Sequence, residues 1–189
     1  GFYDDRGDEI RTETCGPGEG VLSELCRRWE AAAGPAARAG LRTVQSRTGL
    51  VVSSSGGLGR ILGAAYRVGA GARLGRGDQW QPWIGLEDAA AGLLWAIEHD
   101  DVHGPVNLTA PEPLRNRDLH RLLSRACGPP SPAVVPQILL DRVGRAGAAG
   151  GTGGIGGMLA ELLGASQRAV PQALLASGFR FTAPDAASI

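Results

Sequence analysis

The strongest constraint on the fold of this chain is the alternation of short strands with helices over its first two thirds. Three short apolar or β-branched runs predict strands, at residues 41–46, 50–52 and 105–108. Four stretches rich in helix-forming or periodically apolar residues predict helices, at residues 21–33, 58–68, 89–98 and 116–127. Helices that separate successive strands are typical of parallel sheets, because parallel strands need a long crossover. The sequence therefore predicts an α/β layer with parallel strands.

The balance of charges excludes some classes of partner. The 189 residues contain 19 basic and 19 acidic side chains, and every basic one is arginine. A neutral chain has no overall field to attract nucleic acid or an anionic membrane surface. We therefore expect no nucleic acid and no membrane as partner. Because the chain contains no lysine, it cannot perform chemistry that needs a lysine amine.

The cysteines and the first residues of the chain indicate the compartment in which the protein is located. Cys15, Cys26 and Cys127 are scattered and lack C-x-x-C spacing, which is typical of free thiols in a reducing cytoplasm. No apolar run has the length of a signal peptide or a membrane span. The predicted location is the cytoplasm. The chain opens without methionine on Gly-Phe-Tyr, which resembles mid-domain sequence, so we expect a fragment.

A proline-rich connector at residues 129–136 follows the alternating part of the chain, and the last third is helical and irregular. We assign residues 1–128 to a partial α/β domain and residues 129–189 to a small, mostly helical C-terminal domain. Its predicted helices are residues 138–143, 158–168 and 172–176, with a glycine-rich insert at 144–157. Within the insert, residues 151–156 match G-x-G-x-x-G, a pattern that binds pyrophosphate when it follows a buried strand. The preceding glycines and alanines predict no strand, so we interpret the segment as a flexible insert.

Residues 78–88 attract attention because two tryptophans precede a helix with an acidic first turn. Acidic residues at this place face the free N–H groups and the positive end of the helix dipole. Ala89, Leu93 and Ile97 predict a narrow apolar stripe on that helix, facing the core. The stretch has two interpretations, a core anchor or the rim of a ligand site.

Three segments are predicted to converge. Arg47, Thr48 and Gly49 follow a predicted strand, residues 69–77 form a predicted loop, and residues 79–83 come next. Ligands of open parallel sheets bind beyond the carboxyl ends of the strands. Arg47 at that place either pairs with a phosphate or carboxylate or braces the loop, and the sequence alone leaves both open.

The histidines predict no metal site. His99 and His103 are four residues apart beside two aspartates, which imitates a metal-binding pair. No third ligand has a suitable spacing, so we interpret the pair as part of a solvated helix end.

A series of short segments runs in the order of one known family along nearly the whole chain. They are GFYDDRGDE at 1–9, WEAAA at 29–33, RTGLVV at 47–52, residues 75–88, GPVNLTAP at 104–111, ASQR at 165–168 with Pro171, and GFRF at 178–181. Together they resemble the C-terminal portion of the atypical short-chain dehydrogenase/reductase subfamily known as the nucleoside-diphosphate-sugar epimerase family.

The resemblance implies the C-terminal part of a Rossmann-like NAD(P)-binding fold, with NADP or NAD as cofactor and a C-terminal domain of unassigned role. It implies that the glycine-rich cofactor loop of the family lies upstream of Gly1. The positions that it assigns to the cofactor side are Tyr3, Arg47, Thr48 and Gly49. The positions that it assigns to the substrate side are Gln79, Trp83 and Asp88.

The sequence departs from the superfamily at its acid–base pair. The helix that would carry Tyr-x-x-x-Lys has Val21 and Leu25 instead, and Gly85 replaces the usual histidine after Trp-Ile. Two functions therefore stay open. One is part of an NAD(P)-dependent epimerase/dehydratase-family oxidoreductase that acts on a small carbonyl or nucleotide-sugar substrate. The other is a non-catalytic dinucleotide-binding or protein-interaction module. A homodimer is compatible with both.

Overall fold

The computed structural model describes residues 1–53, 56–127, 133–136, 138–139 and 164–185. Its strands are β1 (Ile10–Arg11), β2 (Val44–Thr48), β3 (Leu50–Val52), β4 (Ala72–Leu74), β5 (Trp80–Gln81), β6 (Trp83–Gly85), β7 (Gly104–Leu108), β8 (Leu114–Arg115), β9 (Ala133–Val135) and β10 (Arg168–Ala169). Its helices are α1 (Val21–Ala32), α2 (Gly34–Arg38), α3 (Gly57–Arg67), α4 (Leu86–Glu98), α5 (Asn116–Cys127) and α8 (Gln172–Ala176). The structure confirms the predicted α/β class.

The strands pair mostly in parallel, as the alternation of elements predicts. β2 pairs with β7, β3 with β6, β4 with β9 and β1 with β10, all in parallel, while β5 and β8 are antiparallel. Gly49 alone separates β2 from β3. Its backbone N–H donates to the Leu108 carbonyl over 3.0 Å, and the next N–H, of Leu50, donates to the Pro82 carbonyl over 2.7 Å. One nearly continuous strand therefore changes partner from β7 to β6 at Gly49.

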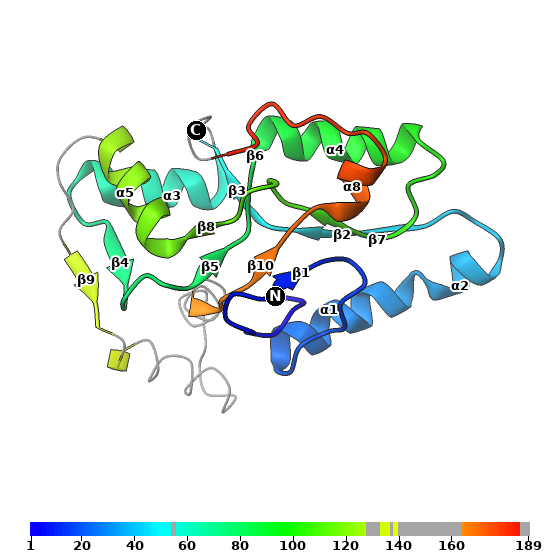
Figure 1. The fold of residues 1–189 in the computed structure, drawn as a ribbon, viewed down its shortest axis with the longest axis horizontal. Helices are drawn as coiled ribbons and strands as arrows, with labels where there is room; N and C mark the ends of the chain where they lie inside the picture. The colour runs from blue at the N-terminus through cyan, green and yellow to red at the C-terminus, as the bar shows by residue number, and fades with distance from the viewer. Residues whose placement is uncertain (54–55, 128–132, 137, 140–163, 186–189) are drawn as a thin grey trace.

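Helices lie on both sides of the β2–β7 pair. Figure 1 shows α4 and α8 on one side and α1 on the other. The apolar core occupies the α4 side, and its buried members are Ile84, Ala89, Ala96, Val102, Val106, Leu108, Leu174 and Phe179. Because α8 supplies Leu174, the described C-terminal residues share this core. The division into two domains at residue 128 stays a prediction.

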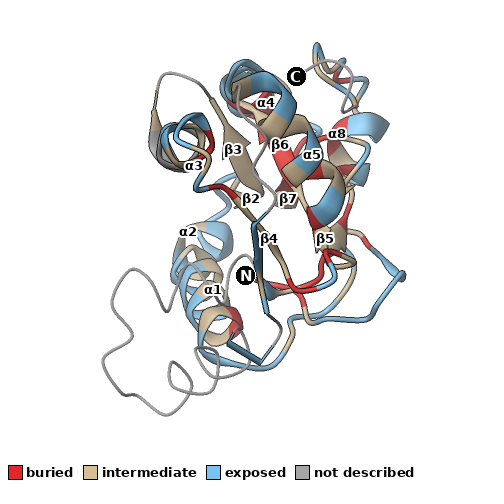
Figure 2. Cartoon of the chain, turned by 90° about the vertical axis from the view of Figure 1, so that its left-hand side faces the viewer, coloured by how far each residue is buried: buried red, intermediate tan, exposed pale blue. Residues whose placement is uncertain are grey.

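The predicted inward face of α4 is right for Ala89 and wrong for Leu93 and Ile97. Leu93 and Ile97 are 47% and 69% exposed, and the buried apolar positions are the small residues Ala89, Gly92 and Ala96. The reason is close packing on β7, since a methyl group added at Gly92 would lie 2.6 Å from a Leu108 methyl carbon. A helix of this kind buries its smallest side chains and leaves the larger ones outside. Figure 2 shows the exposed side of α4 pointing away from the strands.

Other predicted boundaries are partly corrected. The strand predicted at 41–46 is β2 and begins at Val44. The loop predicted at 69–77 contains β4, which pairs with the distant β9. The helix predicted at 158–168 is wrong at its end, because Arg168 belongs to β10 and pairs with Ile10. In each case a partner far along the chain decides the conformation, and a local pattern does not contain it. Residues 140–163, with the G-x-G-x-x-G segment, lie outside the described residues.

Three predicted elements are confirmed. The structure contains α5 at residues 116–127 and α8 at 172–176, and β7 covers the strand predicted at 105–108. Among the described residues, no helix has the length and apolar character that crossing a membrane requires.

Candidate functional site

A cavity of about 640 Å³ separates α1 from β2 and β3. Its wall runs along all of β2 and passes the carboxyl ends of β2 and β7, at Gly49 and Thr109. From α1, its lining includes Cys26, Trp29 and Glu30. Trp29 lies on the cavity side of the helix and is 69% exposed. This volume is in the range of small-molecule sites.

The four residues that were predicted on the cofactor side all line this cavity. Tyr3, Arg47, Thr48 and Gly49 come from the N-terminal loop and from the end of β2. Gly49 is required there by a close approach, because an added methyl group would lie 2.8 Å from the Pro82 carbonyl oxygen. The structure thus brings these residues together, and their role toward a cofactor stays a prediction.

Arg47 is held by partners within the chain. Its guanidinium donates to both carboxylate oxygens of Glu30, over 2.7 and 2.9 Å, and to the Tyr3 hydroxyl over 2.9 Å. It also donates to the Glu13 carbonyl over 3.2 Å and lies 3.4 Å from the centre of the Phe2 ring. A bidentate pair of this kind fixes the guanidinium in place. Arg47 therefore braces α1 and the N-terminal loop against β2.

Tyr3 continues this network into the interior. Its hydroxyl donates to the side-chain oxygen of Asn107 over 2.7 Å. The backbone N–H of the fully buried Asn107 donates to Glu13 over 3.0 Å, and its amide nitrogen donates to the Val170 carbonyl over 2.9 Å. The same Glu13 oxygen accepts the N–H of Ala173, over 3.1 Å. The network connects the N-terminal loop, β2, β7 and the start of α8.

Electrostatics keep this network in one protonation state. Burial raises the pKa of Tyr3 above its usual value, although the hydrogen bond from Arg47 opposes the rise. Burial alone would lower the pKa of Arg47, but its hydrogen bonds with Glu30 and Tyr3 raise that pKa above its usual value. Tyr3 is therefore neutral and Arg47 charged at physiological pH. A tyrosine in this state is not an activated acid–base group.

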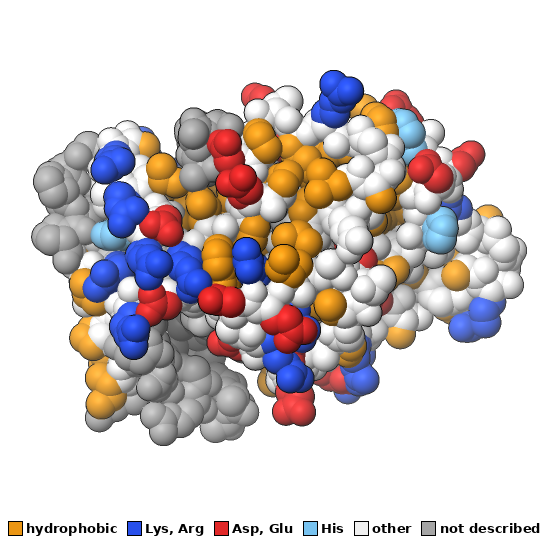
Figure 3. All heavy atoms as spheres, viewed as in Figure 1, with side chains coloured by type: hydrophobic (Ala, Val, Ile, Leu, Met, Phe, Trp, Pro, Cys, Tyr) orange, Lys and Arg blue, Asp and Glu red, His pale blue; other side chains and the backbone are white. Residues whose placement is uncertain are grey.

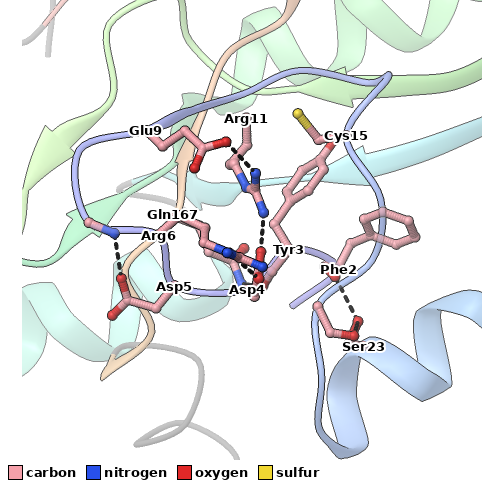
Figure 4. A network of polar contacts seen from close by, with 12 residues as sticks. Phe2, Tyr3, Asp4, Asp5, Arg6, Glu9, Arg11, Cys15, Ser23 and Gln167 are labelled. Atoms are coloured by element: carbon pink, nitrogen blue, oxygen red, sulfur yellow. Dashed lines mark hydrogen bonds and ion pairs between the residues drawn. The ribbon is translucent and has the colours of Figure 1, made fainter.

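The N-terminal loop is held by a second set of contacts, shown in Figure 4. The Gln167 amide donates to the Tyr3 carbonyl over 2.5 Å, and the Ser23 hydroxyl donates to the Phe2 carbonyl over 2.7 Å. Arg11 pairs with Glu9 over 2.9 Å and also with Asp4. These contacts fix the backbone on both sides of Tyr3, so its ring enters the cavity wall in one orientation.

Hydroxyl groups contribute to the polar part of the cavity wall outside the arginine network, together with amide side chains such as Gln45 and Gln81. Ser46 and Thr48 are exposed neighbours on β2, with their hydroxyl oxygens 3.0 Å apart. Thr109 is buried, and its hydroxyl oxygen has no hydrogen-bond partner. A buried hydroxyl without a partner is costly to a protein. Because Thr109 also lines the cavity, its hydroxyl is a candidate hydrogen-bond partner for a ligand at the end of β7.

The three predicted substrate-side residues do not line the cavity. The Gln79 amide donates to the Leu74 carbonyl over 3.2 Å, and the fully buried Trp83 donates to the Glu112 carbonyl over 2.8 Å. Asp88 is also buried and accepts three hydrogen bonds of 2.7 to 2.9 Å from Thr182 and Ala183. Each of the three connects segments of the fold, and a substrate role for them stays a prediction.

The stretch 78–88 reaches the cavity through other residues, Gln81 and Pro82. Trp80 instead lies on the surface between two arginines, with Arg115 and Arg168 at 4.2 and 4.7 Å from its ring centre. In this region of β4, β8 and α5, Figure 3 shows basic and acidic side chains interleaved. Asp78, for example, pairs with Arg117 and with Arg76.

Sequence reasoning missed Asn107, Thr109, Glu30 and Trp29 as cavity residues. Asn107 and Thr109 could have been predicted, because they lie at the carboxyl end of a predicted strand, where ligands of open parallel sheets bind. Glu30 and Trp29 could not, because their position depends on how α1 lies against β2.

Comparisons with known proteins agree with this geometry. Residues 154–189 match a family described as a domain of unknown function, DUF1731. Over 181 residues, 96% of the chain, the sequence is 39% identical to an epimerase family protein of Mycobacterium bovis, of which it covers 56%. The chain thus spans about half the length of the curated relatives that it matches.

Solved structures show the same likeness. The human epimerase family protein SDR39U1, solved with NADPH, is 26% identical with a TM-score of 0.82, over 99% of this chain and 60% of that one. A nucleoside-diphosphate sugar epimerase from Corynebacterium glutamicum is 32% identical with a TM-score of 0.74, over 99% of this chain and 34% of that one.

The fold therefore defines the chain as a Rossmann-like α/β protein of the short-chain dehydrogenase/reductase type. Within that class, the chain belongs to the epimerase family. The resemblance predicted from its sequence segments is confirmed.

Proposed function

We propose that the cavity between α1 and β2 receives the nicotinamide end of NADP(H) or NAD, within an oxidoreductase that acts on a small carbonyl or nucleotide-sugar substrate. The observation that carries the proposal is the position of the cavity, which passes the carboxyl ends of the parallel strands β2 and β7. The similar human epimerase family protein SDR39U1, whose structure was solved with NADPH, supports the choice of cofactor.

The residues present fit a neutral, planar, polar group. A carboxamide and a ribose need hydrogen-bonding partners without net charge, and the Ser46, Thr48 and Thr109 hydroxyls offer them. The half-exposed apolar lining, including Trp29, offers surface for a ring. When bound, the nicotinamide would supply hydride transfer, whereas this chain would orient the ring and exclude water.

The same residues do not fit a pyrophosphate. Of the described side chains that line the cavity, that of Arg47 is the one cation, and its guanidinium is held by Glu30, Tyr3 and Glu13. Among the described strands, β2 has β7 as its sole partner, so its second edge faces the cavity unpaired. We infer that, in proteins of the relatives' length, further residues beside this edge complete the site and bind the phosphates.

A second candidate is a binding module without turnover. It is favoured by the absence of an activated acid–base group, because Tyr3 is held neutral and Val21 and Leu25 replace the tyrosine and lysine of the superfamily. In this case the cavity would bind the dinucleotide and reduce no carbonyl.

Trp29 provides the test. We expect NADPH to change its fluorescence saturably when the 189-residue chain is titrated, and we expect Trp29→Phe to abolish the signal. Thr109→Val should weaken binding by about fivefold, since one hydrogen bond is worth about 1 kcal/mol. The matched control, Thr182→Val, lies outside the cavity and should leave the affinity unchanged.

The outcomes separate the candidates. Saturable binding with oxidation of NADPH in the presence of a carbonyl or nucleotide-sugar substrate supports the oxidoreductase. Saturable binding without oxidation favours the module. If circular dichroism shows a folded chain and the fluorescence of Trp29 does not respond to NADPH, the cavity is not a nicotinamide site.

A further inference from the structure

The outward face of α4 is an apolar helix surface with no cover among the described residues. Leu86, Leu93, Leu94 and Ile97 are 47%, 47%, 53% and 69% exposed. Single exposed leucines are ordinary on protein surfaces. Four exposed aliphatic side chains on one helix, beside its buried alanines and glycine, form an apolar surface that is unusual for a helix left in water.

The spacing of this surface is that of a helix that pairs with another helix. Leu86, Ala90, Leu93 and Ile97 follow one another at intervals of four, three and four residues, which is the heptad pattern of a coiled-coil seam. The buried face of α4 uses a different set of positions, Ala89, Gly92 and Ala96. The helix therefore carries two separate packing faces, and β7 and α8 occupy one of them.

Charges beside the surface restrict what can cover it. Glu87 and Glu98 are exposed and eleven residues apart, so they lie three turns apart on the same flank, about 16 Å from one another along the axis. Neither has an ion pair or hydrogen bond from its side chain in the described part of the chain. α4 contains no basic residue, and the nearby Arg42 is bound to the Ala96 and Ile97 carbonyls and to Asp100.

A second copy of α4 fits this surface poorly. Pairing two such helices antiparallel about a two-fold axis would place Glu87 of one beside Glu98 of the other, and like charges at this distance repel. A helix with basic residues on the matching flank would neutralise both carboxylates.

We propose that the outward face of α4, defined by Leu86, Ala90, Leu93 and Ile97, docks an amphipathic helix of a partner protein. The partner helix carries aliphatic residues at heptad spacing and two basic residues about eleven positions apart, facing Glu87 and Glu98. The aliphatic seam supplies the affinity, and the two ion pairs set the register and select against acidic helices.

The test uses two synthetic helical peptides and the full 189-residue chain. Both peptides have leucine at the heptad positions; one has two arginines eleven residues apart on the flank, and the other has glutamates there. We expect fluorescence anisotropy to show saturable binding of the arginine peptide, and binding at least about tenfold weaker for the glutamate peptide.

Variants locate the surface. Ile97→Asn should weaken binding of the arginine peptide by at least about tenfold, because it removes an aliphatic side chain from the seam. The double variant Glu87→Gln with Glu98→Gln should weaken it about three- to tenfold, and added salt should remove that difference. Leu175→Asn is the matched control, since this leucine is 49% exposed on α8 and lies off the seam; binding should be unchanged.

Three results would overturn the proposal. One is a folded chain that binds neither peptide. Another is equal binding of both peptides, which would show that the acidic flank selects nothing. The third is self-association of the chain in analytical ultracentrifugation that Ile97→Asn abolishes, because the occupant would then be a second copy. None of these readouts depends on NADPH.

Discussion

The two sides of the β2–β7 pair are built differently. On the α4 side, small helix residues lie directly on β7 and the core is apolar, with Leu108 2% and Leu174 0% exposed. On the α1 side, the helix stays apart from the strands and a cavity of about 640 Å³ separates them. Arg47 of β2 connects the strand to the helix on that side, through an ion pair with Glu30 of α1.

The comparison separates stability from binding. Burial of apolar area stabilises a fold more than a few polar contacts do. The α4 side should therefore contribute more to the free energy of unfolding than the α1 side. The α1 side holds its helix through a few polar contacts and leaves hydroxyl groups and an aromatic ring accessible. A site can form on this side because its packing is incomplete.

The largest expected effect is on the α4 side. Leu108→Ala removes a buried side chain that contacts α4 at Gly92, and we expect a loss of about 3 kcal/mol in the free energy of unfolding. Leu50→Ala is the matched change on the cavity side and should cost about 1 kcal/mol, since Leu50 is only half-buried. Urea unfolding measures both. Equal losses would contradict the asymmetry.

The next effect concerns the contact that holds α1. Glu30→Gln leaves the mostly buried Arg47, whose side chain is 9% exposed, without its carboxylate, and should cost about 2 kcal/mol in the free energy of unfolding. Glu24→Gln changes the same residue type on the exposed side of α1, where it pairs with Arg28. It should leave the free energy of unfolding nearly unchanged, because water screens an exposed ion pair. A similar loss for both variants would mean that Arg47 does not brace the helix.

A smaller effect, a gain in stability, is expected for the cavity wall at the end of β7. Thr109→Val removes a buried hydroxyl that has no partner, so we expect the free energy of unfolding to rise by about 1 kcal/mol. The same variant should bind NADPH more weakly. Stability that falls instead would indicate that this hydroxyl has a structural role.

The smallest effect is seen only at alkaline pH. Because burial raises the pKa of Tyr3 above 10.0, the unfolded chain loses this proton first. The contribution of Tyr3 to stability is therefore complete below about pH 10 and is lost as the pH rises through its folded-state pKa. Tyr3→Phe should lose less stability between about pH 9 and about pH 11. Tyr66, whose pKa is raised to about 12, provides the same background in both proteins.

Local patterns predicted the elements whose determinants are local. The helix at 116–127 matches α5 because its apolar spacing and its ends lie within the segment. The strand at 105–108 likewise matches most of β7. β4 and β10 escaped prediction, since each consists of two or three residues that become a strand through pairing with a distant segment.

The candidate site was likewise predicted in part, where its residues follow from local sequence, and missed where they depend on distant contacts. The rule that ligands bind beyond the ends of parallel strands found Arg47, Thr48 and Gly49, which the structure places in the cavity wall. It did not find that Gln81, rather than Gln79, reaches the cavity. Which of the two glutamines does so depends on how β5 pairs with β8, and the sequence does not show that pairing. Nor did the rule show that Arg47 is held by Glu30.

The alternation of strands and helices, read from the sequence alone, determined the α/β class, and an ordered series of segments determined the epimerase family. Both the fold class and the family follow from the order of residues along the chain, so the sequence is sufficient to predict them. The tertiary structure alone decided which face of α4 is buried, and it reversed the prediction. Hydrophobicity favours burying Leu93 and Ile97, but Leu108 of β7 leaves no room for a side chain at Gly92, and the other buried apolar residues of that face are Ala89 and Ala96. The distance between α4 and β7 is fixed by the strands beneath the helix and not by the helix itself.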